Sequence, residues 1–439
     1  MEILSLYGLK SFWKEIFWFA NGNQEKRMPE EFIVAEDLDL AWSNFDPFYP
    51  LPAGCPFYME PEGKPLNRLI NALLRTHRQP PKYFFSGHRG CGKSTELNRL
   101  AANDDIKRKF FVVKYSVRDV CDVNNLNYVD VLFSIGAQLY LQYEDSGREL
   151  RPELMADLEA WRNNIVERVS EEESSFETSV GGGIRGLFIS VMAKIRAEDT
   201  TRKTIREVIE PRLSELIEKI NSIIADIEGR EGKNVLVIID DLDKPNLEQA
   251  TEIFYNNQTA ITQPVCHIVY TVPISMFFSL EFMAIRKTRF RLPNIKLHVK
   301  NDRASRYEPG YDLLKTFIFK RMKEDLIEPD AVDLAIEMGA GVFRESARIM
   351  QIAADSAIER GRDCITKEDV EKAGQEIRSD FKRTLKTDDY VILKELYEDN
   401  AIRGIEKIGH LLHNLSVLEY ENGENWCDIH PTLVKILDI

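Results

Sequence analysis

Eight consecutive residues in the first quarter of the chain have the types and the spacing of a phosphate-binding loop. The stretch Gly87-His88-Arg89-Gly90-Cys91-Gly92-Lys93-Ser94 matches the pattern G-x-x-x-x-G-K-[ST]. Its glycines let backbone N–H groups approach phosphate oxygens that side chains would block. Lys93 adds a positive charge at the same oxygens, and Ser94 offers a hydroxyl to Mg²⁺. We therefore expect residues 87–94, with Thr95 beside them, to bind a nucleotide.

The residues on either side predict the elements that position this loop. Residues 83–86 are Tyr-Phe-Phe-Ser, which is typical of a buried strand, and residues 93–100 have helical spacing. The N-terminus of that helix would face the phosphates, because its first backbone N–H groups have no partners within the helix.

A second stretch supplies acidic groups. Residues 235–239 are Val-Leu-Val-Ile-Ile, the pattern of a parallel strand that is buried on both faces, and Asp240 and Asp241 follow at once. An acid at the tip of such a strand holds Mg²⁺ in P-loop enzymes. We assign Asp240 to the metal, together with Ser94, and Asp241 to the attacking water. Thr271, at the tip of a further predicted strand over 266–273, would lie near the γ-phosphate.

Alternating strands and helices predict an α/β protein with a parallel sheet and helices on both faces. We divide the chain into a lead-in (1–65), a P-loop ATPase core (66–305) with a helical insertion at about 145–230, a helical lid (306–380) and a C-terminal domain (386–439). The C-terminal domain has helices, then two strands around an Asn-Gly turn, which predicts a winged helix.

Four further expectations concern single segments. Residues 202–227 are predicted to form one long helix, and 295–299 a strand. Residues 180–191 are apolar and rich in glycine, so we expect a hairpin or a flexible insertion there. Residues 3–20 form an amphipathic helix that packs on its own domain or docks on a partner, rather than on a membrane.

Composition excludes several classes of protein. The 439 residues carry a net charge of −14, which disfavours non-specific binding along DNA or RNA.

The six cysteines stand singly, which argues against disulfides and a zinc site and suits a reducing, cytoplasmic location. Cys91 lies in the loop, but we assign it no catalytic role. We find no secretory signal and no stretch that predicts a membrane span.

Taken together, these motifs resemble the AAA+-like P-loop ATPases, and within them the STAND and KAP types of bacterial signalling and conflict systems. The resemblance rests on residues 87–94, on the acids from Asp240 and on the strand that ends at Thr271. It implies a sensor role for Arg344, which follows Gly341 in a predicted lid helix. It also implies that His430, just before the last helix, contacts the β-phosphate of ADP.

The resemblance further implies a Mg²⁺-dependent ATPase that assembles into homo-oligomers on binding ATP. Asp241 stands where AAA+ enzymes usually carry glutamate, so we expect slow hydrolysis. An arginine from a neighbouring subunit usually completes such sites. The candidates are Arg202, Arg206, Arg286, Arg289 and Arg291.

Two functions compete. The first is a switch, driven by ATP and ADP, that controls a sensor or effector in a separate polypeptide. The resemblance implies that this switch acts in antiphage defence. The second is a DNA-binding ATPase of the origin-recognition type. Residues 386–439 hold five lysines or arginines against eleven acids, a balance of −6, which favours protein contact and makes nucleic acid unlikely. A GTPase would need an N-K-x-D motif, which is missing from the chain.

Overall fold

The computed structural model of the chain describes residues 32–76, 78–172, 176, 182–278, 282, 288–399, 405–422 and 424–437. The helix predicted at residues 3–20 lies outside them. The described residues form two compact units. The first unit contains residues 71–84 and 101–272, and the second contains residues 32–70, 85–100 and 273–437.

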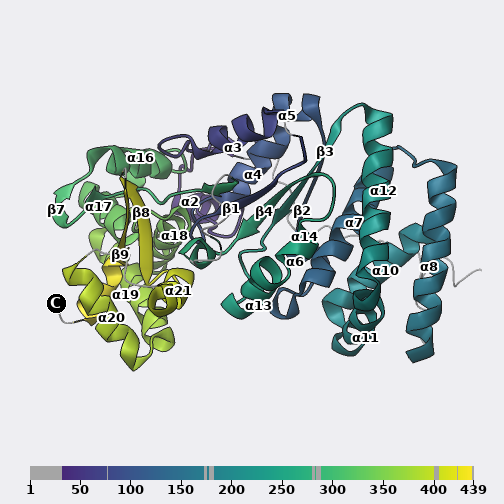
Figure 1. The fold of residues 1–439 in the computed structure, drawn as a ribbon. Helices are drawn as coiled ribbons and strands as arrows, with labels where there is room; N and C mark the ends of the chain where they lie inside the picture. Colours follow the sequence, from purple (N-terminus) through teal and green to yellow (C-terminus); the bar gives the residue numbers. More distant parts are fainter. Residues whose placement is uncertain are drawn as a thin grey trace, which may run out of the picture. The chain divides into compact units, whose positions relative to one another are not determined.

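A five-stranded sheet carries the motifs, with the strand order β2-β3-β4-β1-β5 (Figure 1). Its strands are β1 (Lys82–Ser86), β2 (Phe110–Ser116), β3 (Asn234–Asp240), β4 (His267–Val272) and β5 (Arg289–Arg291). Strands β2 and β4 both pair with β3 in parallel, and residues 235–239 of β3 are completely buried. Together with the loop that follows β1, this confirms the predicted α/β fold of a P-loop NTPase.

The fifth strand differs from the sequence-based expectation. The strand predicted at 295–299 is not part of the main sheet, in which β5 is the edge strand beside β1. Only β6 (His298–Val299) forms there, and it pairs with β7 (Asp302–Arg306) in a separate antiparallel ribbon. The physical reason is that Leu292 N donates a hydrogen bond of 2.8 Å to Ser86 O, so the residues just before 293 extend the sheet beside β1.

Helices of the first unit pack against one another and against the sheet. They are α5 (Asp104–Lys109), α6 (Val117–Val120), α7 (Tyr128–Asp145), α8 (Pro152–Glu172), α10 (Gly183–Ala197), α11 (Asp199–Ile209), α12 (Leu213–Glu231), α13 (Leu247–Thr251) and α14 (Gln258–Ile261). Helix α12 contacts both β2 and β3, and α10 packs between α7 and α8 (Figure 1).

Two predictions in this unit are wrong. The glycine-rich stretch is neither a hairpin nor an irregular insertion from residue 183 onward, because it forms the helix α10. Its residues Ile184, Leu187, Phe188 and Val191 repeat at helical spacing and are buried. The predicted long helix over 202–227 is two helices, since Pro211 lies in the short 3₁₀ turn between α11 and α12.

In the second unit, lid and C-terminal helices share one hydrophobic core, which includes Ile349, Leu393, Leu411, Val417 and Leu433. The helices described in or entering this unit are α2 (Leu38–Asn44), α3 (Pro65–Leu74), α4 (Lys93–Ala102), α16 (Glu308–Phe319), α17 (Pro329–Met338), α18 (Phe343–Glu359), α19 (Lys367–Thr384), α20 (Thr387–Glu398) and α21 (Ile405–His413). The hairpin of β8 (Val417–Asn422) and β9 (Glu424–Ile429) follows, and the 3₁₀ helix η7 (Pro431–Ile436) ends the described chain (Figure 1).

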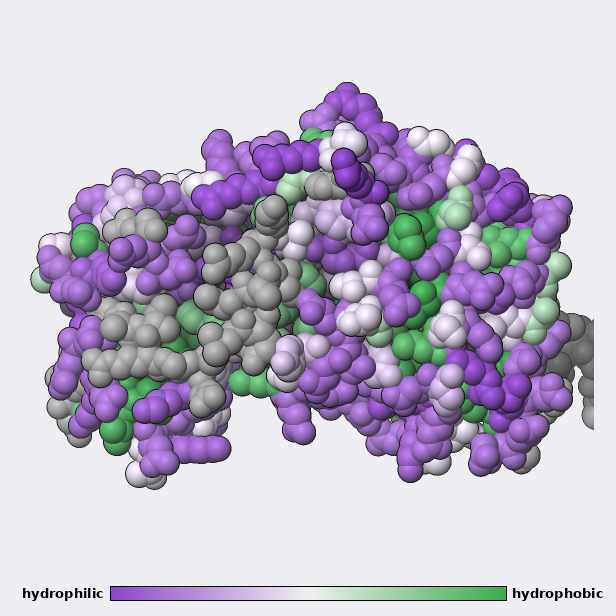
Figure 2. All heavy atoms as spheres, in the orientation of Figure 1, coloured by the Kyte–Doolittle hydropathy of each residue, from purple (hydrophilic) through white to green (hydrophobic). Residues whose placement is uncertain are grey.

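Hydrophilic residues cover most of the described surface on the face shown in Figure 2, with small apolar patches among them. Within the described residues, every helix is too short or too polar to cross a membrane.

Candidate functional site

The predicted phosphate-binding loop has the backbone that its sequence requires. Residues 87–92 connect β1 directly to α4, which begins at Lys93. Gly90 and Gly92 have φ angles of 83° and 101°, in the left-handed region that side chains rarely enter. A Cβ atom on Gly90 would also lie 2.3 Å from Cβ of Arg344, so only glycine allows the lid to approach the loop this closely.

Lys93 is buried, and its Nζ donates hydrogen bonds of 2.8 Å to the carbonyl oxygens of Gly87 and His88. These bonds fix the ammonium group against its own loop. Ser94 and Thr95 follow in the first turn of α4. Thr95 Oγ1 accepts a hydrogen bond of 3.2 Å from Leu51 N, so the lead-in segment crosses this turn. Cys91 is buried within the loop.

The lid reaches the loop through Arg344, near the start of α18. Its backbone N–H donates to Gly90 O at 3.1 Å. Its side chain turns toward the lead-in, where Nε donates to Pro47 O at 3.1 Å and the guanidinium lies 5.7 Å from the ring centroid of Phe48. The structure thus brings the backbone of Arg344 to the loop, and its sensor role stays a prediction.

The C-terminal segment also contacts the loop, through two partners that the sequence did not reveal. Nε2 of His88 accepts a hydrogen bond of 2.8 Å from the backbone N–H of Glu419 in β8. Arg89 donates from Nη2 to Nε2 of His413, in α21, at 2.5 Å. Each of His88, Arg89 and Gly90 therefore has a partner in the lid or the C-terminal segment. The sequence held no local signal for these contacts.

Burial sets the protonation states at this contact. Desolvation lowers the pKa of His88 to about 3, with a smaller contribution from the charge of Lys93, so His88 is neutral and accepts at Nε2. Desolvation raises the pKa of Glu419 to about 7, even though the neighbouring Arg291 pulls it down. For both His88 and Glu419, desolvation shifts the pKa more than the charges of neighbouring residues do.

His430 is completely buried at the N-terminus of η7. Its Nδ1 lies 2.8 Å from Thr432 Oγ1, and its ring packs 5.1 Å from that of Phe381. Its Nε2 has no hydrogen-bond partner among the described residues. Burial lowers its pKa to about 3. Contact of His430 with a β-phosphate stays a prediction.

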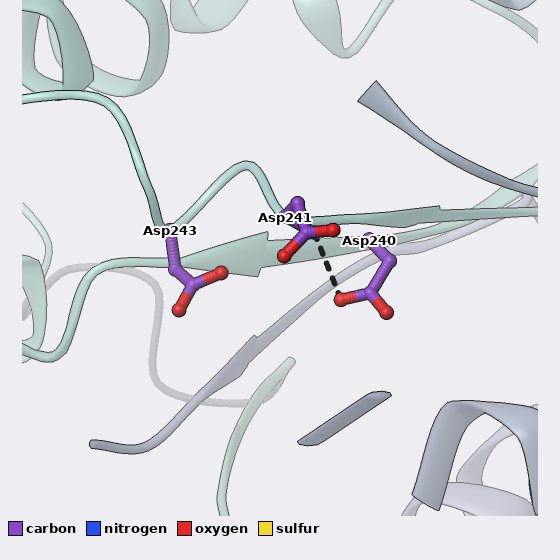
Figure 3. A group of neighbouring side chains, drawn as sticks. All are labelled: Asp240, Asp241 and Asp243. Carbon is purple, nitrogen blue, oxygen red and sulfur yellow. Dashed lines mark hydrogen bonds between the residues drawn. The ribbon is translucent and has the colours of Figure 1, made fainter. Parts of the chain in front are cut away.

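The acidic turn belongs to the first unit and follows β3. Asp240 is buried, and Asp241 has a φ of 63°, an unusual conformation for a residue other than glycine. Asp241 N donates to Asp240 Oδ1 at 2.8 Å (Figure 3). Ser116, at the end of β2, donates from its hydroxyl to Asp241 Oδ2 at 2.7 Å. Both carboxylates are therefore held in position at the end of the sheet.

Thr271 organises this turn from the neighbouring strand. Its Oγ1 accepts from Leu242 N at 2.9 Å and lies 3.2 Å from Ile239 O, to which the hydroxyl donates. The side chain is fully buried. Thr271 thus anchors the acidic turn, and its position near a γ-phosphate stays a prediction.

The acidic turn offers ligands of the kind that Mg²⁺ prefers. Carboxylate oxygens of Asp240, Asp241 and Asp243 lie within 4.8 Å of one another (Figure 3). Lys244 Nζ is 3.4 Å from Asp243 and 3.9 Å from Asp241, which offsets part of their repulsion. Hard cations take such oxygen ligands, so these residues fit the metal that the P-loop motif implies. Asp243 had no role in the site predicted from the sequence.

The arginines proposed to act between subunits are in different environments. Arg202 is buried and pairs with Asp122 at 3.1 Å and Asp199 at 2.8 Å. Arg206 donates from Nε to Asp130 Oδ1 at 3.0 Å. These intramolecular pairs make both arginines poorly suited to reach a neighbour.

The remaining three arginines lie in or before β5. Arg289 lies 5.6 Å from the ring centroid of Phe277, and Arg291 pairs with Glu419. Arg286 lies outside the described residues.

Comparison with known proteins shows a distant likeness to solved structures. No family model matches the chain, and no curated protein matches it. Cdc6p from Pyrobaculum aerophilum is 13% identical, with 90% of this chain and 97% of that chain covered and a TM-score of 0.41. The Aeropyrum pernix ORC1 protein, solved in complex with DNA, is 14% identical, with 90% and 96% covered and a TM-score of 0.42. A RuvB variant from Thermotoga maritima is 12% identical, with 85% and 93% covered and a TM-score of 0.36.

Because these TM-scores are below 0.5, the fold assignment rests on the features of the chain itself. These features are the strand, loop and helix over residues 82–102 and the parallel strand β3 that ends in Asp240. The chain has an α/β P-loop NTPase fold.

Proposed function

We propose that this protein is an AAA+-like ATPase of the STAND or KAP type that binds ATP and hydrolyses it slowly. The nucleotide would bind on residues 87–95 of the loop. Lys93 would contact its phosphates, and Ser94 with Asp240 would hold Mg²⁺. Bound Mg²⁺ would neutralise charge on the phosphates. The fixed Lys93 and the paired carboxylates of the acidic turn support this proposal.

Asp241 would orient and activate the attacking water. Its carboxylate is held by the Ser116 hydroxyl, and its turn is anchored by Thr271, so little reorganisation would be needed during the reaction. The phosphate-binding loop follows β1 and Asp241 follows β3, and these two strands belong to one sheet with β4 between them. Arg344 would sense the bound nucleotide from the lid.

We further propose that hydrolysis drives a molecular switch. The observation that carries this proposal is the pair of contacts from the loop to the C-terminal segment, His88 to Glu419 and Arg89 to His413. A change at the phosphates would act on these two loop residues first. The segment that they hold would then transmit the change to a separate partner protein, with homo-oligomers forming on ATP binding. Antiphage defence follows from the resemblance alone, and a cytoplasmic location follows from the six cysteines, which stand singly in the sequence.

The alternative, DNA binding by the C-terminal helices, has less support. In α21, the helix before the hairpin, His413 contacts the loop and His410 pairs with Asp389 at 2.7 Å. Two polar side chains of α21 thus bind other residues of the protein and are less available to contact DNA. An electrophoretic mobility assay with duplex DNA, repeated with ATP and with ADP, tests the alternative. Tight binding that weakens with salt would favour it.

Equilibrium binding of a fluorescent ATP analogue tests the main proposal. Lys93→Ala should abolish binding, because it removes the charge that faces the phosphates. Lys107→Ala, which removes an exposed lysine from α5, is the matched control and should bind as the wild type does. Equal affinity of the Lys93→Ala variant and the wild type would refute nucleotide binding at this loop.

A further inference from the structure

A small buried cluster joins the loop to the C-terminal hairpin, and we call it the hairpin junction. It consists of His88 in the loop, Arg291 in β5, Asn294 just after β5, and Glu419 in β8. Glu419 binds all three partners. Its N–H donates to His88 at 2.8 Å, its O accepts from Asn294 Nδ2 at 3.2 Å, and its carboxylate pairs with the Arg291 guanidinium.

Arg291 lies beside the phosphate-binding loop. The next residue, Leu292, donates from its backbone N–H to Ser86 O, at the end of β1. The carbonyl of Leu292 also approaches Gly87, where a Cβ atom would come within 2.7 Å of it. The positive charges of both Lys93 and Arg291 act on His88 and contribute to its lowered pKa. Arg291 is thus a further cation near the loop, in addition to Arg89, Lys93 and Arg344.

In its ionised form the carboxylate of Glu419 pairs with Arg291 and offsets its charge. Only 2% of the Glu419 side chain is exposed, against 24% of the Arg291 side chain. Charges held at such short range with little water between them interact strongly. Arg291 therefore adds little positive potential at the loop while the hairpin is in place.

The hairpin junction is also incompletely bonded. Among the described residues, Glu419 Oε2, Arg291 Nε and Asn294 Oδ1 are buried without a hydrogen-bond partner. Buried polar groups usually find partners, and each one that does not lowers stability. A polar network that is only partly satisfied is costly in a medium of low dielectric. Water would satisfy all three groups if the hairpin separated from the loop, which lowers the cost of opening.

We propose that the hairpin is a releasable lock that withholds the charge of Arg291 from the phosphate-binding loop. When the hairpin separates, Glu419 leaves and Arg291 becomes available to the phosphates of a nucleotide bound in the same chain. This inference rests on the proposed function, because it assumes that the loop binds a nucleotide. It adds a regulatory role for Glu419 and a ligand role for Arg291.

Substitution of Glu419 tests the lock. Glu419→Gln removes the negative charge and keeps the side-chain size. It should bind the fluorescent ATP analogue about ten-fold more tightly, which is the effect of one charge-assisted contact. The gain should shrink as salt increases, because screening weakens the freed charge. Glu424→Gln is the control, since it removes the same charge from an exposed position of the same hairpin and should leave affinity unchanged.

Arg291→Gln shows whether the freed charge is the cause. Glu419→Gln should give no gain when it is introduced into Arg291→Gln. A gain that persists in this background, or no gain in Glu419→Gln alone, would overturn the inference.

Hydrogen exchange provides a second readout. Backbone amides of residues 417–421 in the wild type should exchange faster with the ATP analogue bound than without it, because the docked hairpin protects them. Equal exchange in the two states would also overturn the lock. Absence of nucleotide binding in the wild type would instead overturn the proposed function and the inference with it, so the two failures are distinguishable.

Discussion

The backbone N–H of Glu419 donates a hydrogen bond of 2.8 Å to Nε2 of His88, although 331 positions separate the two residues in the sequence. This bond joins the hairpin to the loop whose motif indicates phosphate binding. It uses the backbone of one residue and the side chain of the other, so the identity of His88 matters while Glu419 contributes its N–H whatever its side chain. The carboxylate of Glu419 remains available for Arg291.

Gly90→Ala should destabilise the protein because the lid packs directly on the loop. Its Cβ atom would lie 2.3 Å from Cβ of Arg344, and its φ of 83° already disfavours alanine. Gly54→Ala is the control, since Gly54 has a φ of 81° and nothing within 4 Å of the added Cβ. We expect a loss of about 1 kcal/mol at Gly54 and about 1–3 kcal/mol more at Gly90, measured by urea denaturation. Equal losses would mean that the lid does not pack on Gly90 in solution.

Asp241→Asn should retain ATP but lose at least about a hundred-fold in turnover, because an amide does not take a proton from water. Asparagine tolerates the φ of 63° at this position, so the backbone of the turn should persist. Steady-state phosphate release and nucleotide affinity are the measurements. Turnover at the wild-type rate would show that another group activates the water.

Thr271→Val should loosen the acidic turn. Valine has the shape of threonine but lacks the hydroxyl that bonds Leu242 N and Ile239 O. A buried N–H would then have no partner, which costs about 1–3 kcal/mol of unfolding free energy. Thr271→Ser keeps the hydroxyl and should restore ATP turnover. Equal turnover in the Val and Ser variants would contradict the anchoring role.

The pKa of Glu419 predicts a pH dependence of stability. Burial raises this pKa from 4.5 to about 7, so the folded protein holds the proton more tightly than the unfolded chain does. The resulting stabilisation is complete below pH 4.5 and is lost as pH rises through about 7. It amounts to about 3 kcal/mol at most. The charged and titratable groups that act on Glu419 are Arg291, Glu421, His88 and Cys427.

Glu419→Gln should remove this dependence, since glutamine does not titrate. The free energy of unfolding of the wild type minus that of the variant should therefore fall between pH 5 and pH 8. His88 and His430, which are buried and neutral, have the opposite effect: the protein loses the stability they contribute as pH falls below 6.5. Both histidines are present in the wild type and in the variant, so their effect cancels in the difference. A difference that stays constant with pH would contradict the raised pKa.

The size of the assembled protein should depend on which nucleotide is bound. Light scattering should detect larger species with a non-hydrolysable ATP analogue than with ADP, because an arginine from a neighbouring subunit completes such sites when ATP is bound. Lys93→Ala should stay at the smaller size with both nucleotides. A wild-type protein of constant size would refute the assembly model.

Short-range patterns in the sequence were enough to predict the elements of the candidate site. The glycine spacing of residues 87–94 predicted the loop, and the apolar run of residues 235–239 predicted β3 and its acidic end. Both predictions succeed because left-handed backbone and burial on both faces restrict residue type at neighbouring positions. The hairpin was predicted for the same reason, from its alternating residues and its turn.

Only the tertiary structure decided what surrounds the loop. Arg344, His413 and Glu419 come to residues 88–90 from α18, α21 and β8, and which atoms meet depends on packing across the whole second unit. The tertiary structure also decided the position of β5. Its three residues are too few to show a strand period in the sequence, and hydrogen bonding beside β1 places them in the sheet. Contacts between residues hundreds of positions apart leave no spacing in a single sequence, because their geometry is set by the core that the folded chain buries.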